Sequence, residues 1–291
     1  MSPTLSLHAP AKLNLTLDIL GKTADGYHEL DSVMLSVDLC DTLTITRTEA
    51  GLRLDCSDPA LCVGEDNLVI RAARAFFAQT GIEPGGLELS LAKQIPQQAG
   101  LAGGSADAAA TLHGLNRLYD AGLNDGELAK IGLAIGSDLP FCVRGGIARA
   151  GGRGERLATL PPLPREAVFV IAKQAEGMST RRAFELYSQS KTRPLPRTQA
   201  MVAAINEGSL EAIGAAMSNA FEQVLPLPLV GELRQAMLRG GALGAAMTGS
   251  GTAVCGLFDN QERALACLTK LRDQADFACI ARPLTHGTKI I

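Results

Sequence analysis

Residues 96–110 read P-Q-Q-A-G-L-A-G-G-S-A-D-A-A-A, and the rest of the chain is interpreted outward from this segment. Its glycines lack a Cβ atom, so the backbone can turn sharply there and approach another molecule closely. From Ala106 onward small and apolar residues recur at helical spacing, and Ser105 is the expected N-cap. The pattern predicts a glycine-rich loop that leads directly into a helix.

Two interpretations of this loop stay open on the residues alone. The free N–H groups and the positive dipole end of a helix N-terminus suit a phosphate group. An ordinary loop before a helix of small residues that packs tightly against a neighbour fits equally well. The segment has neither the Gly-Lys-Ser/Thr ending of a P-loop nor the G-x-G-x-x-G dinucleotide fingerprint, so both of those nucleotide-binding classes are excluded.

Composition sets the class of protein. The 291 residues suggest about two domains or one large one, and 46% hydrophobic with 20% charged residues is typical of a globular protein. A net charge of −3 without a basic block argues against a nucleic-acid partner. The absence of a long apolar run or a signal-peptide pattern predicts a cytoplasmic protein without a membrane partner. Seven cysteines without a C-x-x-C pair indicate reduced, buried thiols and neither disulfides nor a zinc site.

The first half of the chain alternates between strand and helix patterns. Alternating apolar residues predict strands, in a mostly antiparallel sheet, over residues 5–20, 33–39, 41–46, 52–56 and 87–91. Capping residues before residue 68 and Gly81 after residue 80 predict a helix between them. After the loop helix, a short helix over 127–135 ends at a turn that contains Asp138, and residues 139–143 are expected to lead into a strand.

The second half predicts an α+β sandwich. Five glycines over 145–154 indicate a tight hairpin, and L-P-P-L-P at 160–164 is the linker candidate, so we expect domains at 1–160 and 161–291. Strands are predicted over 167–172 and 278–281, with a hairpin over 242–258 that turns at 248–252. Helices are predicted from 180, 199, 210, 220, 229 and 261.

Single residues do not predict a chemistry here. A lone lysine such as Lys12 is more often a solvated surface residue, and a lone aspartate in a turn, such as Asp138, is more often a local cap. His28, taken alone, is more often a hydrogen-bonded histidine at a strand edge. The argument for function therefore depends on several segments taken together.

Three segments together resemble the motifs of the GHMP small-molecule kinases. They are P-A-K-L-N-L at 10–15, G-L-A-G-G-S-A-D-A-A at 100–109 and M-T-G-S-G at 247–251, and the resemblance extends over nearly the whole chain. Residues 9–34 and 135–141 are similar, more narrowly, to the branch of the family whose alcohol substrate carries a cytidine diphosphate group, in the non-mevalonate route to isoprenoid precursors.

The resemblance implies a fold and an activity. The expected fold is α+β, a two-domain GHMP kinase fold with an N-terminal ribosomal-protein-S5-like β-α domain and a C-terminal ferredoxin-like α/β sandwich. The expected activity is transfer of a phosphoryl group from ATP to an alcohol, with Mg²⁺ as the second cofactor. Two alternatives remain, a sister GHMP kinase acting on another small alcohol and a non-catalytic nucleotide-binding sensor. Monomer and homodimer both stay open.

The resemblance also assigns residues. Lys12 and Asp138 match the catalytic pair, and Asn14 matches a residue near the substrate hydroxyl. Tyr27 and His28 match the dipeptide that recognises cytidine, and Phe184 matches an aromatic residue on the other face of the cytosine. The ATP-binding positions are Asn67 and Lys93 at the adenine nucleoside and, around the phosphates, Pro96, Gln97, Gln98, Ala99, Gly100, Leu101, Ala102, Gly103, Gly104, Ser105 and Ala106.

Three expectations from this resemblance can be decided only by the three-dimensional structure. Ala102 replaces a glycine that most family members carry, and alanine is tolerated there if its φ is negative. Ser105 is a candidate metal ligand. Residues 248–252 are either a plain hairpin turn or a second loop beside the active site, and the family match favours the loop.

Overall fold

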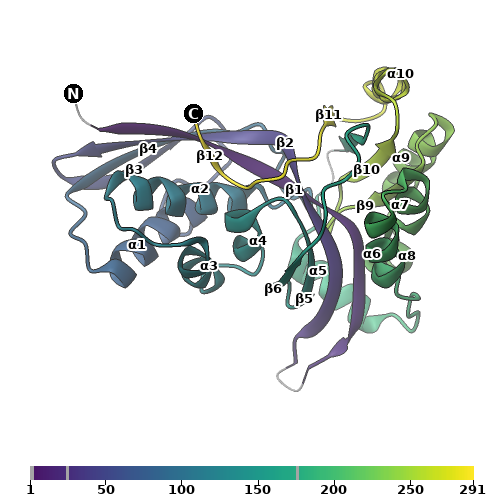
Figure 1. Ribbon diagram of the computed structural model, residues 1–291, viewed down its shortest axis with the longest axis horizontal. Coiled ribbons are helices and arrows are strands. Elements are labelled where there is room, and N and C mark those ends of the chain that lie inside the picture. Colours follow the sequence, from purple (N-terminus) through teal and green to yellow (C-terminus); the bar gives the residue numbers. More distant parts are fainter. Residues whose placement is uncertain (1–2, 24–25, 175–176) are drawn as a thin grey trace.

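Two β-sheets with helices packed on them make up the computed structural model, which describes residues 3–23, 26–174 and 177–291. A long ribbon of two strands, β1 (Thr4–Lys22) and β2 (His28–Thr48), runs through the molecule and bends from the first sheet toward α5 (Thr180–Gln189) (Figure 1). Because this ribbon contacts both halves, its residues lie between them.

The first sheet has the strand order β12-β1-β2-β4-β3, with β5 on β2, β6 on β5 and β8 on β1. Its pairs are antiparallel except for β3 with β4 and β8 with β1, which are parallel. Besides the ribbon, its strands are β3 (Gly51–Cys56), β4 (Gly86–Ala92), β5 (Ile147–Gly152), β6 (Arg156–Thr159), β8 (Ser218–Asn219) and β12 (Lys289–Ile290).

Four helices lie together against one face of this sheet (Figure 1). They are α1 (Leu68–Thr80), α2 (Gly103–Leu118), α3 (Asp125–Leu133) and α4 (Leu139–Arg144). Leu43, Ile45 and Leu89 of the sheet form one core cluster with apolar residues of α1 and α2. Because the buried side chains at the start of α2 are mostly alanines, the helix packs closely against the strands. This close packing sets the position of the helix N-terminus relative to β1.

The second sheet is antiparallel throughout, with the order β11-β7-β10-β9. Its strands are β7 (Val168–Lys173), β9 (Gly244–Met247), β10 (Val254–Phe258) and β11 (Phe277–Ala281), and its helices, after α5, are α6 (Thr198–Glu207), α7 (Leu210–Ala216), α8 (Ala220–Val224), α9 (Pro228–Arg239) and α10 (Gln261–Leu271). Along β7, Phe169 and Ile171 face one core cluster while Val168 and Val170 face another. A strand buried on both faces reads as an unbroken apolar run, as this one does.

One apolar core joins the two halves. It contains Leu13 and Leu35 of the ribbon together with Ile171, Met201 and Cys255 from the second half. The chain passes from the first sheet to the second through an irregular connection at residues 160–167, and the domain boundary proposed there stays a prediction.

Most predicted elements are present, two predictions are wrong in detail and one short strand was not predicted. Residues 33–39 and 41–46 belong to one continuous strand, because β2 pairs with β1 over nearly its whole length. Residues 139–144 form the helix α4, with Pro140 in its first turn, and the next strand begins only at Ile147. The short strand β12 has no signal in the sequence and depends on pairing with β1.

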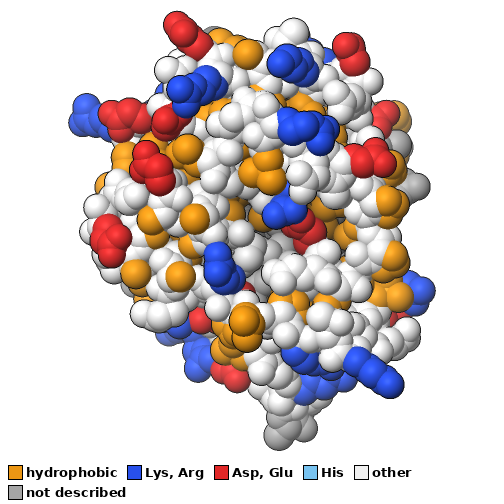
Figure 2. Space-filling model, turned by 90° about the vertical axis from the view of Figure 1, so that its right-hand side faces the viewer, with side chains coloured by type: hydrophobic (Ala, Val, Ile, Leu, Met, Phe, Trp, Pro, Cys, Tyr) orange, Lys and Arg blue, Asp and Glu red, His pale blue; other side chains and the backbone are white. Residues whose placement is uncertain are grey.

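The distribution of surface charge and the state of the cysteines can be compared with the expectations from composition. On the face drawn in Figure 2, acidic and basic side chains are intermixed. All seven cysteines are unpaired, but only Cys142, Cys255 and Cys267 are buried. Cys40, Cys56 and Cys279 are partly buried and Cys62 is exposed, so the expectation of buried thiols holds for three of the seven. Among the helices in the described part of the chain, none combines the length and apolarity needed to cross a membrane.

We expect two matched glycine substitutions to report the packing of α2 against the sheet. A Cβ on Gly231 of α9 would meet no atom within 4 Å, so G231A should raise the free energy of unfolding by about 0.5–1 kcal/mol through helix propensity. A Cβ on Gly114 of α2 would lie 2.5 Å from Cδ1 of Ile45, so G114A should lower it by about 1 kcal/mol. Urea unfolding measures both, and equal stabilisation by the two variants would contradict this packing.

Candidate active site

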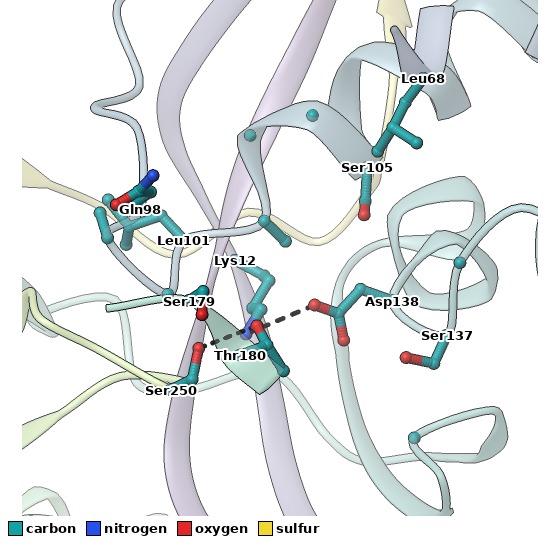
Figure 3. A pocket seen from close by; sticks show the side chains of 18 of the residues that line it. Lys12, Leu68, Gln98, Leu101, Ser105, Ser137, Asp138, Ser179, Thr180 and Ser250 are labelled. Carbon is teal, nitrogen blue, oxygen red and sulfur yellow. Dashed lines mark hydrogen bonds and ion pairs between the residues drawn. The ribbon is translucent and has the colours of Figure 1, made fainter. Parts of the chain in front are cut away.

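A large pocket opens where the two halves meet the ribbon. Its cavity volume is about 1240 Å³, which exceeds the usual size of a site for one small ligand and leaves room for two substrates. Lys12, Asp138 and Ser105 converge at its centre (Figure 3). Every predicted site residue lines this pocket except Ala106, which is buried within α2.

The glycine-rich loop leads into α2 as expected, but Ser105 is not its cap. The helix begins at Gly103 after Ala102, and no side chain caps its first turn. Ser105 is therefore the third residue of the helix, and its hydroxyl points toward the same opening as Asp138 (Figure 3). The uncapped N–H groups are left for another partner, and a phosphate suits them.

Ala102 does not meet the condition set for it. Its φ is +56°, in the left-handed region, where a Cβ costs about 1 kcal/mol relative to glycine. Gln98 has a similar φ of +48°. The loop therefore has left-handed backbone conformations at two residues whose side chains disfavour them. Contacts with the neighbouring segments must hold the loop in this conformation.

Residues 248–252 form the second loop beside the site. A Cβ on Gly100 would lie only 2.0 Å from the carbonyl oxygen of Thr248, so the two loops touch backbone to backbone. Ala253 N–H donates to the carbonyl oxygen of Ala99 at 3.1 Å, and the Thr180 hydroxyl lies 3.0 Å from the Ser250 hydroxyl. The segment is a hairpin connection that also closes one wall of the pocket.

Lys12 and Asn14 reach the pocket because the ribbon is irregular there. The pairing of β1 with β2 shifts register between Pro10 and Lys12 and again between Asn14 and Thr16. Such bulges redirect side chains. Lys12 is 3% exposed, and its ammonium donates to Oδ1 of Asn14 at 2.5 Å, so the amide orients it.

Lys12 and Asp138 form an ion pair across the pocket. Nζ of Lys12 lies 3.8 Å from Oδ2 of Asp138 (Figure 3). Asp138 occupies the N-cap position of α4, yet its side chain makes no capping hydrogen bond, so it is not the local cap that a lone aspartate suggests. A third polar group that enters the pocket at this point can contact both the Asp138 carboxylate and the Lys12 ammonium.

Lys93 lines the pocket, and two carboxylates hold its ammonium. Its ammonium pairs with Asp107, at 2.7 Å, and with Asp41, so it is fully engaged below the loop. Burial opposes its charge, but the two carboxylates outweigh burial and raise the pKa of Lys93. Burial raises the pKa of Asp107 to about 8, against the opposing effect of Lys93. Any contact of Lys93 with a nucleoside is thus left to its main chain and alkyl stem.

At the far end of the pocket, aromatic residues gather from both halves. The His28 ring stacks on the Phe184 ring at 4.8 Å between centroids, and its Nε2 lies 3.1 Å from the Ser188 hydroxyl. Burial, followed by the charges of Lys22 and Arg193, lowers the pKa of His28, so the ring is neutral at pH 7. A neutral imidazole offers one donor and one acceptor to a polar ring edge.

Asn67 is the N-cap of α1, as expected from the sequence, and it also lines the pocket near the glycine loop. Its amide donates to the carbonyl oxygen of Cys62 at 2.6 Å. No cluster of three or more His, Cys, Asp or Glu side chains that could hold a metal by itself occurs in residues 3–23, 26–174 and 177–291. A metal ion at this site would need ligand oxygens from a bound molecule.

Sequence reasoning missed several residues of the site. Asp41 falls on the same side of its strand as Leu43 and Ile45, and a carboxylate at a buried position needs a partner, which was a readable signal. Asp107 lies inside the recognised motif but was read only as a helical residue. Nothing local marks Thr180, because its role depends on a loop far along the chain.

Two family models match the chain, and known proteins are similar to it over most of its length. The model described as "GHMP kinases N terminal domain" matches residues 67–146, and the one described as "GHMP kinases C terminal" matches residues 201–276. A relative from Gloeobacter violaceus, named 4-diphosphocytidyl-2-C-methyl-D-erythritol kinase, is 44% identical over 90% of this chain and 88% of its own.

Two solved structures are similar over almost the whole chain. A crystal structure of 4-(cytidine 5'-diphospho)-2C-methyl-D-erythritol kinase has a TM-score of 0.79 and 31% identity, covering 95% of this chain and 99% of its own. A homoserine kinase from Cytophaga hutchinsonii has a TM-score of 0.80 at 20% identity, covering 100% of this chain and 98% of its own. The second likeness concerns the fold alone, so fold similarity does not choose the substrate.

The buried carboxyl of Asp107 should make stability depend on pH. Its raised pKa means that the folded protein keeps a proton that the unfolded chain loses, so this group weakens folding as pH rises from about 4 toward 8. Relative to D107N, the wild-type free energy of unfolding should fall between pH 5 and 8, by up to about 1.4 kcal/mol per pH unit.

Urea unfolding at several pH values measures this difference. D125N makes the same isosteric change at an exposed carboxylate and should leave the pH dependence unchanged. Parallel curves for the wild type and D107N would refute the assignment.

Proposed function

The chain belongs to the GHMP kinase family, and from that premise we propose that it is an ATP-dependent 4-diphosphocytidyl-2-C-methyl-D-erythritol kinase. It transfers the γ-phosphoryl group of ATP to the 2-hydroxyl of the cytidyl alcohol: the new O–P bond forms, the β–γ bond breaks and ADP leaves. The reaction serves the non-mevalonate route to isoprenoid precursors. The cytoplasmic location stays a prediction from the sequence. The sequence leaves both monomer and homodimer open.

One observation carries the kinase proposal. The uncapped N-terminus of α2 opens onto the same cavity in which Lys12 and Asp138 face each other at 3.8 Å. Phosphoryl transfer to an alcohol needs the phosphates held and the hydroxyl activated, and these are the two parts of that arrangement. A sensor that only binds nucleotide has no need of the second part.

Lys12 and Asp138 act on the hydroxyl. Asp138 accepts its proton as the O–P bond forms, a contribution that is typically worth about 10²–10⁴-fold in rate. Lys12, oriented by Asn14, holds the hydroxyl oxygen and offsets the negative charge that gathers on it. Positioning of the hydroxyl by this pair matters as much as proton removal.

The phosphates bind at the glycine loop. The first turn of α2 contains Gly103, Gly104 and Ser105, and the N–H groups of these residues suit the β- and γ-phosphates. When bound with ATP, Mg²⁺ would neutralise charge on the phosphate oxygens. The hydroxyl of Ser105 is the side chain that would hold it, in keeping with the preference of Mg²⁺ for few protein ligands together with phosphate oxygens.

Recognition of cytidine falls to the aromatic end. Because Nε2 of neutral His28 faces the Ser188 hydroxyl, its Nδ1 reads one group of the cytosine edge and the main chain reads the rest. The rings of Tyr27 and Phe184 supply apolar faces. A sister kinase for mevalonate or homoserine would have no use for this set of residues. This end of the pocket supports the cytidyl substrate over the other small alcohols.

A substrate panel tests the proposal. With ATP and Mg²⁺, ADP release should be rapid with the cytidyl alcohol and at background with mevalonate or homoserine, because only the first fills the aromatic end. EDTA should abolish the reaction. Coupled detection of ADP measures each rate, and equal rates with mevalonate or homoserine would reject the proposed substrate.

Variants of the catalytic pair test the mechanism. D138N and K12M should each lower kcat by about 10²–10⁴-fold while KM for ATP changes little, because the phosphate loop is untouched. D125N, an exposed carboxylate on α3, serves as the matched control and should leave kcat unchanged. Near-normal turnover by D138N would remove Asp138 from the reaction.

A further inference from the structure

Asn219 is a buried polar residue that has no role in the site as described so far. It is the second residue of β8, where it pairs with Leu17 of the ribbon, and it is also the N-cap of α8. Asn219 is 1% exposed and does not itself line the pocket. Its side-chain amide nevertheless contacts the loop that lies beside Lys12.

The Asn219 amide uses both of its ends. Its Oδ1 accepts from the N–H groups of Phe221 and Glu222, at 2.9 and 3.4 Å, in the first turn of α8. Its Nδ2 donates to the carbonyl oxygens of Met247 and Gly249, both at 2.8 Å. Because an aspartate has no amide donor and a serine has only one hydroxyl proton, neither could replace both of these last two bonds.

The Gly249 backbone lies against the centre of the site. A Cβ on Gly249 would be 3.1 Å from Nζ of Lys12 and 2.7 Å from the carbonyl oxygen of Gly100 in the phosphate loop. We propose that Asn219 is a positioning residue for phosphoryl transfer, which acts by holding residues 248–252 in the conformation that sets Lys12 and the phosphate loop. This inference rests on the proposed function.

Electrostatics makes the direction of the two carbonyl groups important. A carbonyl oxygen that turned toward the pocket would oppose a phosphate at the N-terminus of α2, and it would compete with Asp138 for the Lys12 ammonium. Asn219 lies outside the pocket lining and binds both oxygens on its own side of the loop. The amide therefore keeps these acceptors away from the anionic substrates.

The loop depends on Asn219 more than the strand before it does. Met247, the last residue of β9, has a second anchor on α8, because its N–H donates to the Glu222 carboxylate at 2.8 Å. In the described part of the chain, the hydrogen-bond donor to the carbonyl oxygen of Gly249 is the Asn219 amide. Loss of this amide should therefore release the loop while β9 stays in place.

Kinetics of N219S and N219D test the inference, because both variants keep an oxygen that can cap α8. With ATP and the cytidyl alcohol, kcat should fall about 10- to 100-fold, the loss expected when catalytic groups are slightly misplaced. KM for the cytidyl alcohol should stay within about threefold, since the residues assigned to cytidine are unchanged.

N260S and N260D are the matched controls. Asn260 caps α10 in the same way, with its Oδ1 accepting from the N–H groups of Glu262 and Arg263, and it does not line the pocket. These variants lose a cap of the same kind without touching the second loop. They should lower the midpoint of urea unfolding at most and leave kcat unchanged.

Hydrogen exchange of the free protein reports on the loop without any turnover. The Ala253 N–H donates to the carbonyl oxygen of Ala99 at 3.1 Å, and the Asn14 N–H donates to the Thr248 hydroxyl at 2.9 Å, so both are protected while the loop is docked. In N219S these two amides should exchange at least about 10-fold faster relative to the amides of β4, and in N260S they should not.

Each result decides the matter. Normal kcat in folded N219S, even with lower stability, would mean that Asn219 only supports the fold, and exchange that quickens equally in β4 would mean the same; both overturn the inference. N219S only removes atoms and keeps a capping hydroxyl, so it decides if the charge of N219D prevents folding. Failure of the proposed function is distinguishable, because it appears as absent turnover of the cytidyl alcohol by the wild type, while exchange still tests the loop.

Discussion

Three backbone segments meet around Lys12, and the site depends on how closely they approach. The N–H of Lys12 donates to the carbonyl oxygen of Leu101 at 3.0 Å, and the N–H of Asn14 donates to the Thr248 hydroxyl at 2.9 Å. Gly100 meets Thr248 with no space for a side chain between them. The ribbon, the phosphate loop and the second loop therefore fix one another, and this contact can hold Ala102 in a left-handed conformation that its Cβ opposes.

Charge in the pocket is arranged in neutralised groups rather than as one field. Lys12 faces Asp138 at the centre, and Lys93 lies between two buried carboxylates below the loop. The Lys93 ammonium offsets the Asp41 carboxylate below the first turn of α2, while Asp107 keeps its proton at neutral pH, so this buried group adds no net negative charge that would oppose a phosphate at the helix N-terminus.

The sequence predicts a structural feature correctly where neighbouring residues determine it. It does not predict features that depend on contacts between segments far apart along the chain. Helix ends at Asn67, Asn124 and Asn260 are marked by their own side chains and were predictable. Ser105 looked like a cap, but the helix is entered three residues earlier, at Ala102, because the loop is held by contacts with other segments. The partners of Lys93 and the stacking of Arg153 on Tyr27 join segments far apart along the chain, so spacing alone could not reveal them.

The core shared by both sheets has a consequence for how this enzyme can be divided. Ile171 and Met201 are covered by Leu13 and Leu35 of the ribbon, so neither half has a complete apolar interior of its own. A fragment cut at the proline-rich connection would expose these faces to water and tend to aggregate. The two regions that separate family models match along the chain therefore share part of their apolar interior.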